Sequence, residues 1–158
     1  MEDRYFAWAG TLAFVGWGAL LMAPLAPVWA QRIGGLAVPA LLSCGYAALV
    51  LVHWADAPGG FGSLDDVAAL LSEPGMLLAG WVHYLAFDLF VGAWIVREGR
   101  RTGVPFALVV PCLPVTLMFG PAGYLLFLGV RAARAAVRAP IGAPAPTVRA
   151  PFDRGART

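Results

Sequence analysis

The sequence predicts an all-α integral membrane protein with four transmembrane helices and a short interfacial helix between the second and third spans. Of the 158 residues, 60% are hydrophobic and only 13% are charged, whereas soluble domains have roughly 45–50% apolar and about 25% charged residues. The mean hydropathy is +0.75. The apolar residues fall into four runs, each long enough for the helix of roughly 20 residues that crosses a bilayer.

The first two spans are predicted at about residues 5–25 and 33–54. Small residues in the first span would let a neighbouring helix approach closely; these are Gly10, Gly16 and Gly18. The connection between the spans holds Pro24, Pro27, Gln31 and Arg32. We expect the first span to be retained, because residues 1–4 lack the basic region of a signal peptide.

The longest connection, residues 55–74, is acidic and predicts a short helix on the membrane surface. Ser63 is the expected N-cap, because Asp65 and Asp66 follow it in the first turn, where the helix dipole favours acids. Apolar residues then recur at helical spacing, namely Leu64, Val67, Leu70 and Leu71. Glu73-Pro74 ends this helix and leads directly into the third span. For Glu73, helix capping and a place at the mouth of a groove are both open.

The third span, residues 75–96, contains two ionisable side chains that are costly inside a membrane, His83 and Asp88. Ionisable residues within transmembrane segments are by default candidates for a functional site. We expect the basic stretch that follows, residues 97–101, to form a turn.

The fourth span, at about residues 104–130, contains four prolines and therefore predicts a kinked or broken helix. Its sharpest break is Phe119-Gly120-Pro121-Ala122-Gly123. At membrane depth, irregular backbone of this kind is buried in protein or lines a cavity. Residues 1–131 are predicted to form the transmembrane domain. Residues 132–158 form an Arg-, Pro- and Ala-rich tail, helical at first with Arg134 and Arg138, and disordered from about residue 140.

All 11 basic residues are arginines. Four full spans would place both termini and the acidic loop on one side of the membrane. Each side would then hold four arginines near its span ends, so the positive-inside rule gives a tie, and the basic extension favours cytoplasmic termini. We expect a bacterial cytoplasmic (inner) membrane protein whose partners are membrane lipid and a second copy or a membrane enzyme, with no nucleic acid.

His83 and Asp88 suggest acid–base chemistry. On an ideal helix they lie roughly 140° apart and are displaced by about 7.5 Å along the axis. They cannot both face one helix, but they could flank a groove, as an acid and a base on opposite sides of an elongated substrate. In the alternative, Asp88 pairs with a Tyr, Ser or Arg and His83 bonds a backbone carbonyl. The nearby aromatic residues either pack against lipid or form a polyene-binding wall; they are Trp81, Tyr84, Phe87, Phe90 and Trp94.

His53 raises a second hypothesis, in which it and His83 are axial ligands of one haem. Their predicted depths differ by about 9 Å, whereas axial ligands must meet at similar depth. Cys44 and Cys112 both lie within predicted spans and are expected to behave as small apolar residues. We therefore expect no metal site and no cofactor.

The same stretch resembles the abscisic-acid-deficient-four-like family, to which plant neoxanthin synthase belongs. The resemblance rests on Trp81-x-His83, on Asp88-Leu89-Phe90 and on Arg97. It also includes the interfacial loop before Glu73 and the Phe119-Gly120-Pro121-x-Gly123 break. It covers about residues 5–130, essentially the whole membrane part.

The resemblance implies a small four-helix membrane protein whose plant relatives are required to convert the epoxide violaxanthin into allenic neoxanthin. That isomerisation needs an acid at the epoxide oxygen and a base at a carbon, and no redox cofactor. Applied to this sequence, the resemblance implies that Asp88 is the acid and His83 the base, or the reverse. The substrate-binding candidates are Trp81, Tyr84, Phe87, Glu73, Arg97, Gly120 and Pro121.

The resulting interpretation is a membrane isomerase-like protein that acts on a carotenoid or a related isoprenoid. The first alternative is a non-catalytic carotenoid-binding or assembly protein, which would tolerate the loss of Asp88. The second is a bis-His haem electron carrier, which would require both His53 and His83.

Overall fold

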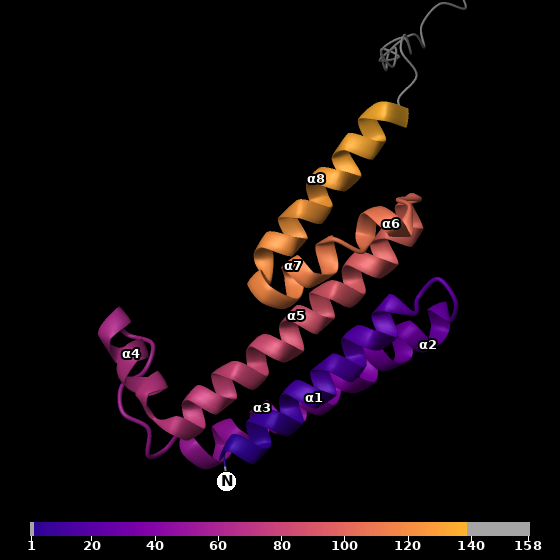
Figure 1. Ribbon diagram of the computed structural model, residues 1–158. Coiled ribbons are helices and arrows are strands. Elements are labelled where there is room, and N and C mark those ends of the chain that lie inside the picture. The colour runs from indigo at the N-terminus through magenta and orange to yellow at the C-terminus, as the bar shows by residue number, and fades with distance from the viewer. Residues whose placement is uncertain (1, 139–158) are drawn as a thin grey trace, which may run out of the picture.

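The computed structural model describes residues 2–138, and all regular structure in this range is helical. The long helix α5 (Pro74–Thr102) is the axis of the molecule. In Figure 1, α1 (Glu2–Leu21) and α3 (Val38–His53) lie on one side of α5. Helices α7 (Cys112–Phe119) and α8 (Pro121–Arg138) lie on the other side. The all-α prediction is confirmed.

Helix α1 (Glu2–Leu21) is followed by one continuous helical rod, Pro27–His53. The rod consists of α2 (Pro27–Arg32), the π-helical turn η1 (Ile33–Ala37) and α3 (Val38–His53). The predicted connection was therefore too long, because Pro27 suits the first turn of a helix and starts one here. The π-turn ends two residues before Pro39, whose ring and missing N–H disturb the preceding turn of an α-helix.

Close packing between α1 and α5 depends on two glycines. A Cβ at Gly16 would overlap the Leu89 side chain, and a Cβ at Gly92 would lie 2.6 Å from the Trp17 ring. Of the three glycines expected to allow close approach in α1, only Gly16 does so, because Gly10 and Gly18 have no such neighbour within 4 Å. This close contact between α1 and α5 determines which face of α5 points away from α1.

The short helix predicted between the second and third spans is present as α4 (Leu64–Ser72), and its predicted N-cap is confirmed. The Ser63 hydroxyl accepts the Asp66 N–H at 3.1 Å. Helix α5 begins directly after Glu73, also as expected, but it does not end at residue 96. The predicted basic turn at residues 97–101 is wrong, because these residues form the last turns of α5. The helix ends at Thr102 and is capped by Gly103, which has a φ of 66°.

The predicted fourth span is divided into α6 (Phe106–Val109), α7 (Cys112–Phe119) and α8 (Pro121–Arg138). The expected break at Gly120 is confirmed, but the chain does not continue across the molecule there. Helix α8 turns back and runs beside α7 (Figure 1). Two contacts fix its direction: Arg131 binds Glu98 at 3.0 Å, and Arg138 donates to the Gly103 carbonyl at 2.8 Å. We call α7 and α8 the α7–α8 hairpin.

Within residues 2–138, two helical stretches are long and apolar enough to cross a membrane, Pro27–His53 and Pro74–Thr102. The four-span prediction is therefore not confirmed. Helix α1 begins with three charged residues, and the chain after Thr102 is broken into shorter helices.

The hairpin also changes the distribution of charge. It brings the arginines of α8 to the end of the molecule where α5 finishes, so the predicted tie is wrong. Among residues 2–138, this arginine end holds seven arginines and one acid, Glu98; the arginines are Arg32, Arg97, Arg100, Arg101, Arg131, Arg134 and Arg138. The opposite, acidic end holds Glu2, Asp3, Asp56, Asp65, Asp66 and Glu73, with Arg4.

The two ends of the described chain, Glu2 and Arg138, consequently lie at opposite ends of the molecule (Figure 1), which corrects the prediction that both termini share a side. The basic helical extension is present up to Arg138. The disorder predicted for the tail from residue 140 falls outside the described residues.

Candidate functional site

A groove with an aromatic wall runs between α1 and α5. Its inner cavity has a volume of about 430 Å³ and is lined by Trp81 and Tyr84 of α5, by Phe14 of α1 and by Leu117 of α7. A second cavity of about 350 Å³ shares Trp81 and reaches Glu2, Asp3 and Pro74 at the acidic end. We call the two cavities together the α1–α5 groove.

Three stacked rings form the wall of the α1–α5 groove. Phe6 and Trp81 have ring centroids 5.2 Å apart, and Trp81 and Tyr84 have centroids 5.6 Å apart. Offset aromatic rings of this kind present a flat, apolar and polarisable surface. The wall leads from the acidic end of the molecule towards the middle of α5.

Asp88 lies one helical turn beyond Tyr84, on the same face of α5. The residue is 6% exposed, and its Oδ2 atom has no hydrogen-bond partner among the described residues. A buried carboxylate oxygen without a partner is costly. Asp88 therefore stands out as a residue that stability alone does not explain.

The Gly120 break packs directly against this carboxylate. Gly120 has a φ of 43°, and a Cβ at this position would lie 2.6 Å from Asp88 Oδ1. Pro121 then starts α8, so Asp88 lies next to the N-terminus of an 18-residue helix, where the helix dipole favours negative charge. The structure thus brings together three of the predicted site residues, Asp88, Gly120 and Pro121.

Tyr84 lies between the α1–α5 groove and Asp88. Its ring lines the inner cavity, whereas Asp88 does not. Its hydroxyl donates to the Leu117 carbonyl at 2.8 Å, which ties α5 to α7. A molecule in the groove consequently meets the Tyr84 ring before it reaches Asp88.

His83 lies on a different face from Asp88. Its ring stacks on Phe87 with centroids 4.6 Å apart and tilts against Tyr46 of α3 with centroids 5.3 Å apart. Both His83 and Phe87 are exposed on the outer surface. The structure therefore does not place His83 and Asp88 on the two sides of one groove, and the role of His83 as a base stays a prediction.

Glu73 and Arg97 lie near opposite ends of α5, 24 residues and hence about 36 Å apart along the axis. Arg97 donates to Gln31 at 3.2 Å at the arginine end. Neither residue lines the inner cavity beside Trp81 and Tyr84.

Glu73 acts as the N-cap of α5. Its Oε2 accepts the Met76 N–H at 2.6 Å, and its Oε1 lies 3.4 Å from His53 Nδ1. A Cβ at Gly75 would overlap the His53 ring, so the glycine allows this contact. The Met76 N–H is the main reason why the pKa of Glu73 is lower than its ordinary value, and the His53 ring acts in the same direction.

We expect Glu73→Gln to lower the melting temperature at neutral pH and to reduce the sensitivity of the protein to acid. The folded-state pKa of Glu73 lies below its ordinary value of 4.5. Its contribution to stability is therefore complete above that value and is lost as the pH falls through the folded-state pKa. Thermal unfolding in detergent between about pH 7 and pH 3 measures the difference. Asp56→Asn, which changes an exposed loop acid, is the control, and equal acid sensitivity of both variants would contradict the assignment.

The two histidines are separated along α5. His53 packs against Gly75, and His83 lies eight residues further on, about 12 Å along the helix axis. No group of three or more His, Cys, Asp or Glu side chains suited to a metal ion occurs within residues 2–138. The positions of His53 and His83 thus give no support to their sharing one haem.

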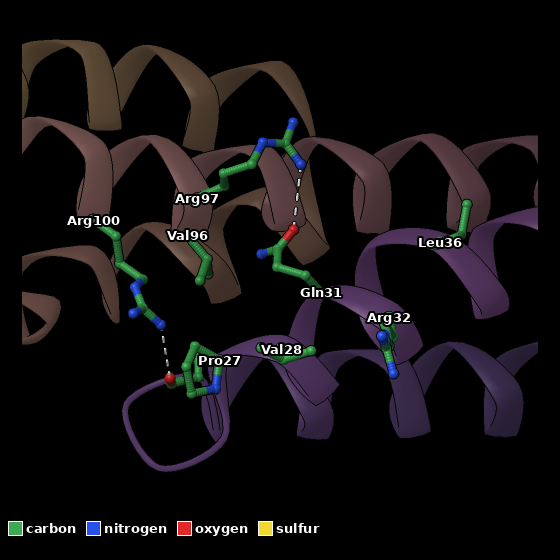
Figure 2. A pocket seen from close by; sticks show the side chains of 9 residues that line it. Pro27, Val28, Gln31, Arg32, Leu36, Val96, Arg97 and Arg100 are labelled. Carbon is green, nitrogen blue, oxygen red and sulfur yellow. Dashed lines mark hydrogen bonds between the residues drawn. The ribbon is translucent and has the colours of Figure 1, made fainter.

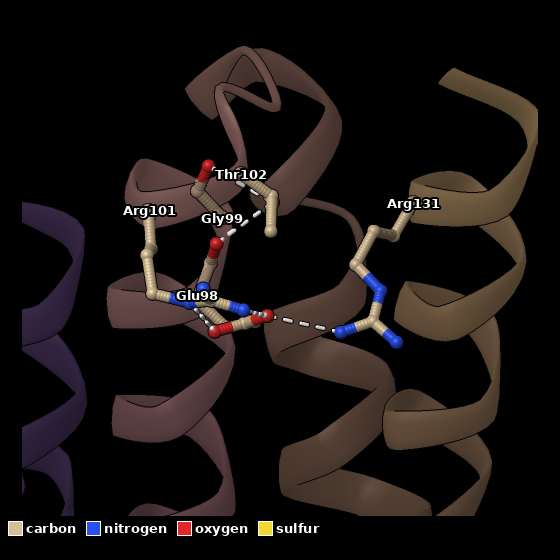
Figure 3. A network of polar contacts seen from close by, with 5 residues as sticks. All are labelled: Glu98, Gly99, Arg101, Thr102 and Arg131. Atoms are coloured by element: carbon tan, nitrogen blue, oxygen red, sulfur yellow. Dashed lines mark hydrogen bonds and ion pairs between the residues drawn. The ribbon is translucent and has the colours of Figure 1, made fainter. Parts of the chain in front are cut away.

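A polar network that the sequence analysis missed joins α5 to α8. Glu98, which is 8% exposed, accepts from Arg101 at 2.7 and 2.8 Å and from Arg131 at 3.0 Å (Figure 3). The Thr102 hydroxyl donates to the Glu98 carbonyl at 2.8 Å. The available signal was a single acid within a basic run, but its partner Arg131 is 33 residues away.

The sequence model of a family described as ABA DEFICIENT 4-like matches residues 4–127. The matched range extends from α1 to Phe127 of α8 and includes the α1–α5 groove, Asp88 and Gly120. No curated protein and no solved structure matches the chain.

Proposed function

The chain belongs to the ABA DEFICIENT 4-like family, and on this premise we propose that it is a membrane isomerase-like protein that acts on a carotenoid or a related isoprenoid. The observation that supports the proposal is the α1–α5 groove, an apolar channel with a wall of stacked rings. Its inner end lies one turn from the buried Asp88, whose Oδ2 atom has no hydrogen-bond partner among the described residues. A long apolar substrate fits such a groove better than a polar metabolite does.

The proposed reaction converts an epoxide into an allenic alcohol without net oxidation or reduction. The Asp88 carboxylic acid gives its proton to the epoxide oxygen as the C–O bond breaks. A vinylic C–H bond then loses its proton, and the electron pair of that bond forms the new C=C bond of the allene. The Asp88 carboxylate takes up this proton, which restores the acid.

One carboxyl group can perform both steps because it has two oxygens. The structure favours this assignment over a separate base, because His83 faces the outer surface. The Tyr84 side chain must move away from Leu117 before a substrate in the groove can reach Asp88. In the proposal Trp81 and Tyr84 bind the polyene, and Gly120, which has no side chain, leaves room for the Asp88 carboxylate.

The test is to produce the protein in a host that makes an epoxycarotenoid such as violaxanthin, and to separate the pigments by chromatography. We expect an allenic isomer that is absent from the host with an empty vector. An absorption spectrum of the protein purified in mild detergent shows whether pigment copurifies in a fixed ratio. Folded protein in the membrane without any new isomer would contradict the proposed activity on that substrate.

A second candidate function is a carotenoid-binding or assembly protein without catalysis. It is favoured by the lining of the inner cavity, where the only polar side-chain groups are the Tyr84 hydroxyl and the Trp81 indole N–H. This function predicts copurified pigment in both the wild type and Asp88→Asn, with no isomer in either.

For the membrane topology we propose three crossings, by α1, by Pro27–His53 and by α5, with the α7–α8 hairpin entering from the arginine end and returning to it. The hydrogen bonds of Arg138 to the end of α5 support the return. The arginine end then faces the cytoplasm of a bacterial cell, because basic residues near span ends are retained on that side.

Cysteine labelling tests this topology. In a background with Cys44→Ser and Cys112→Ser, single cysteines are introduced as Leu64→Cys at the acidic end and Ala135→Cys at the arginine end, both at exposed positions. A maleimide that does not cross membranes should label Leu64→Cys in intact spheroplasts and Ala135→Cys only after lysis. The reverse pattern would invert the orientation, and labelling of both before lysis would contradict the odd number of crossings.

A further inference from the structure

A cavity of about 460 Å³ at the arginine end lies between α2, η1 and α5. Three arginines line it, Arg32, Arg97 and Arg100, and the rest of the lining is mainly apolar. Figure 2 shows Arg97 and Arg100 reaching from α5 on either side of Val96. We call this space the arginine cavity.

The three guanidinium groups have neutral partners. Arg97 donates to the Gln31 side-chain oxygen at 3.2 Å, and Arg100 donates to the Ala23 carbonyl at 3.4 Å. Arg32 lies over the Trp29 ring, 5.6 Å from its centroid. Within residues 2–138 none of the three forms an ion pair, whereas the neighbouring Arg101 and Arg131 both bind Glu98.

Two hydrogen bonds fix the orientation of the Gln31 side chain in the arginine cavity. Its amide nitrogen donates to the Ala93 carbonyl at 3.1 Å, which directs its oxygen to Arg97 (Figure 2). A Cβ at Gly35 would lie 2.9 Å from that oxygen, so the glycine leaves room for the side chain. The Arg97 guanidinium is thereby oriented without neutralisation of its charge.

The apolar part of the lining suits a hydrocarbon chain. Val28, Leu36 and Val96 line the same cavity as the arginines, and Val28 and Leu36 are largely exposed. The cavity lies near the end of α5, a helix long enough to cross a bilayer, and hence at the depth of lipid headgroups. Arginines that form no ion pair within residues 2–138 and lie beside apolar side chains at that depth match a molecule with an anionic head and an apolar tail.

We propose that the arginine cavity binds an anionic phospholipid, with the phosphate between Arg97 and Arg100 and an acyl chain along Val28 and Leu36. Arginine binds phosphate oxygens through paired N–H groups, and basic residues near a membrane surface attract anionic lipids. The site lies at the other end of α5 from the α1–α5 groove and does not depend on the proposed isomerase activity.

The test measures thermal unfolding of the full chain in detergent during titration with short-chain phosphatidylglycerol, phosphatidylcholine or inorganic phosphate. We expect phosphatidylglycerol to raise the melting temperature of the wild type at lower concentrations than phosphatidylcholine does. Arg97→Gln and Arg100→Gln should each weaken its apparent affinity about fivefold. Arg138→Gln, which removes one positive charge at the same end but outside the cavity, is the matched control and should bind as the wild type does.

Three results would overturn the proposal. Equal effects of phosphatidylglycerol and phosphatidylcholine would show that the anionic charge is not recognised. An equal effect of inorganic phosphate would show that the ligand is a free phosphate and not a lipid. Equal losses in Arg97→Gln and Arg138→Gln would show a diffuse attraction to the arginine end instead of a site.

Discussion

Asp88→Asn is expected to reduce formation of the allenic isomer at least about 100-fold, because an amide can neither give a proton to the epoxide nor accept one from carbon. The side chain keeps its shape, so the packing against Gly120 is retained. The measurement is the ratio of product to substrate pigment in an epoxycarotenoid-producing host, normalised to the amount of protein in the membrane.

Stability distinguishes a catalytic Asp88 from a structural one. If Asp88 served only as structural glue, Asp88→Asn would lower the melting temperature. We expect it to leave the melting temperature unchanged or to raise it, since Oδ2 has no partner among the described residues and a buried carboxylate oxygen without a partner is costly.

Two further variants act as controls for this prediction. Glu73→Gln changes the N-cap acid that precedes α5, which lies outside the inner cavity, and should retain isomer formation. His83→Ala separates the two assignments of the base: retained activity supports Asp88 acting alone, and lost activity restores the two-residue mechanism. Full activity of Asp88→Asn would contradict any catalytic role of this residue.

The parts of the fold that follow from short stretches of sequence could be predicted. Ser63 and the acids after it mark the start of α4 because the cap and its partner are three residues apart. The break at Gly120 follows from a glycine next to a proline. These signals are local, and the structure confirms both.

The direction of the chain after Gly120 could not be predicted in this way. A glycine–proline break is compatible with a kink that continues across the membrane and with a hairpin that returns. The hairpin is fixed by contacts distant in sequence, such as Glu98 with Arg131 and Thr102 with Arg138. The predicted tie in the number of arginines on the two sides was wrong for the same reason, because it assumed that the chain after Gly120 crosses the membrane.

The arrangement of the candidate site also depends on contacts between residues that are distant in sequence. Helical spacing correctly separated His83 from Asp88 in angle. It could not tell which face a neighbouring helix covers. Helix α7 and the Gly120 break cover the Asp88 face, whereas His83 stays exposed beside Phe87.

Gly123→Ala is expected to destabilise the protein through the α7–α8 hairpin. A Cβ at this position would overlap the side chain and the backbone of Thr116, which is fully buried and whose hydroxyl donates to the Cys112 carbonyl at 2.8 Å. Backbone cannot move aside as a flexible side chain can, so the helices must separate, and overpacking costs about 1–3 kcal/mol or more. The measurement is the melting temperature in detergent.

Gly129→Ala is the matched control, because it makes the same change in the same helix where the added Cβ has no neighbour within 4 Å. It should leave the melting temperature unchanged or raise it, since alanine favours helix over glycine by about 1 kcal/mol. Separation of α7 from α8 would also withdraw Gly120 from Asp88, so isomer formation should fall in Gly123→Ala and persist in Gly129→Ala. If both variants behaved alike, the returning hairpin would not be the arrangement that holds Asp88 in place.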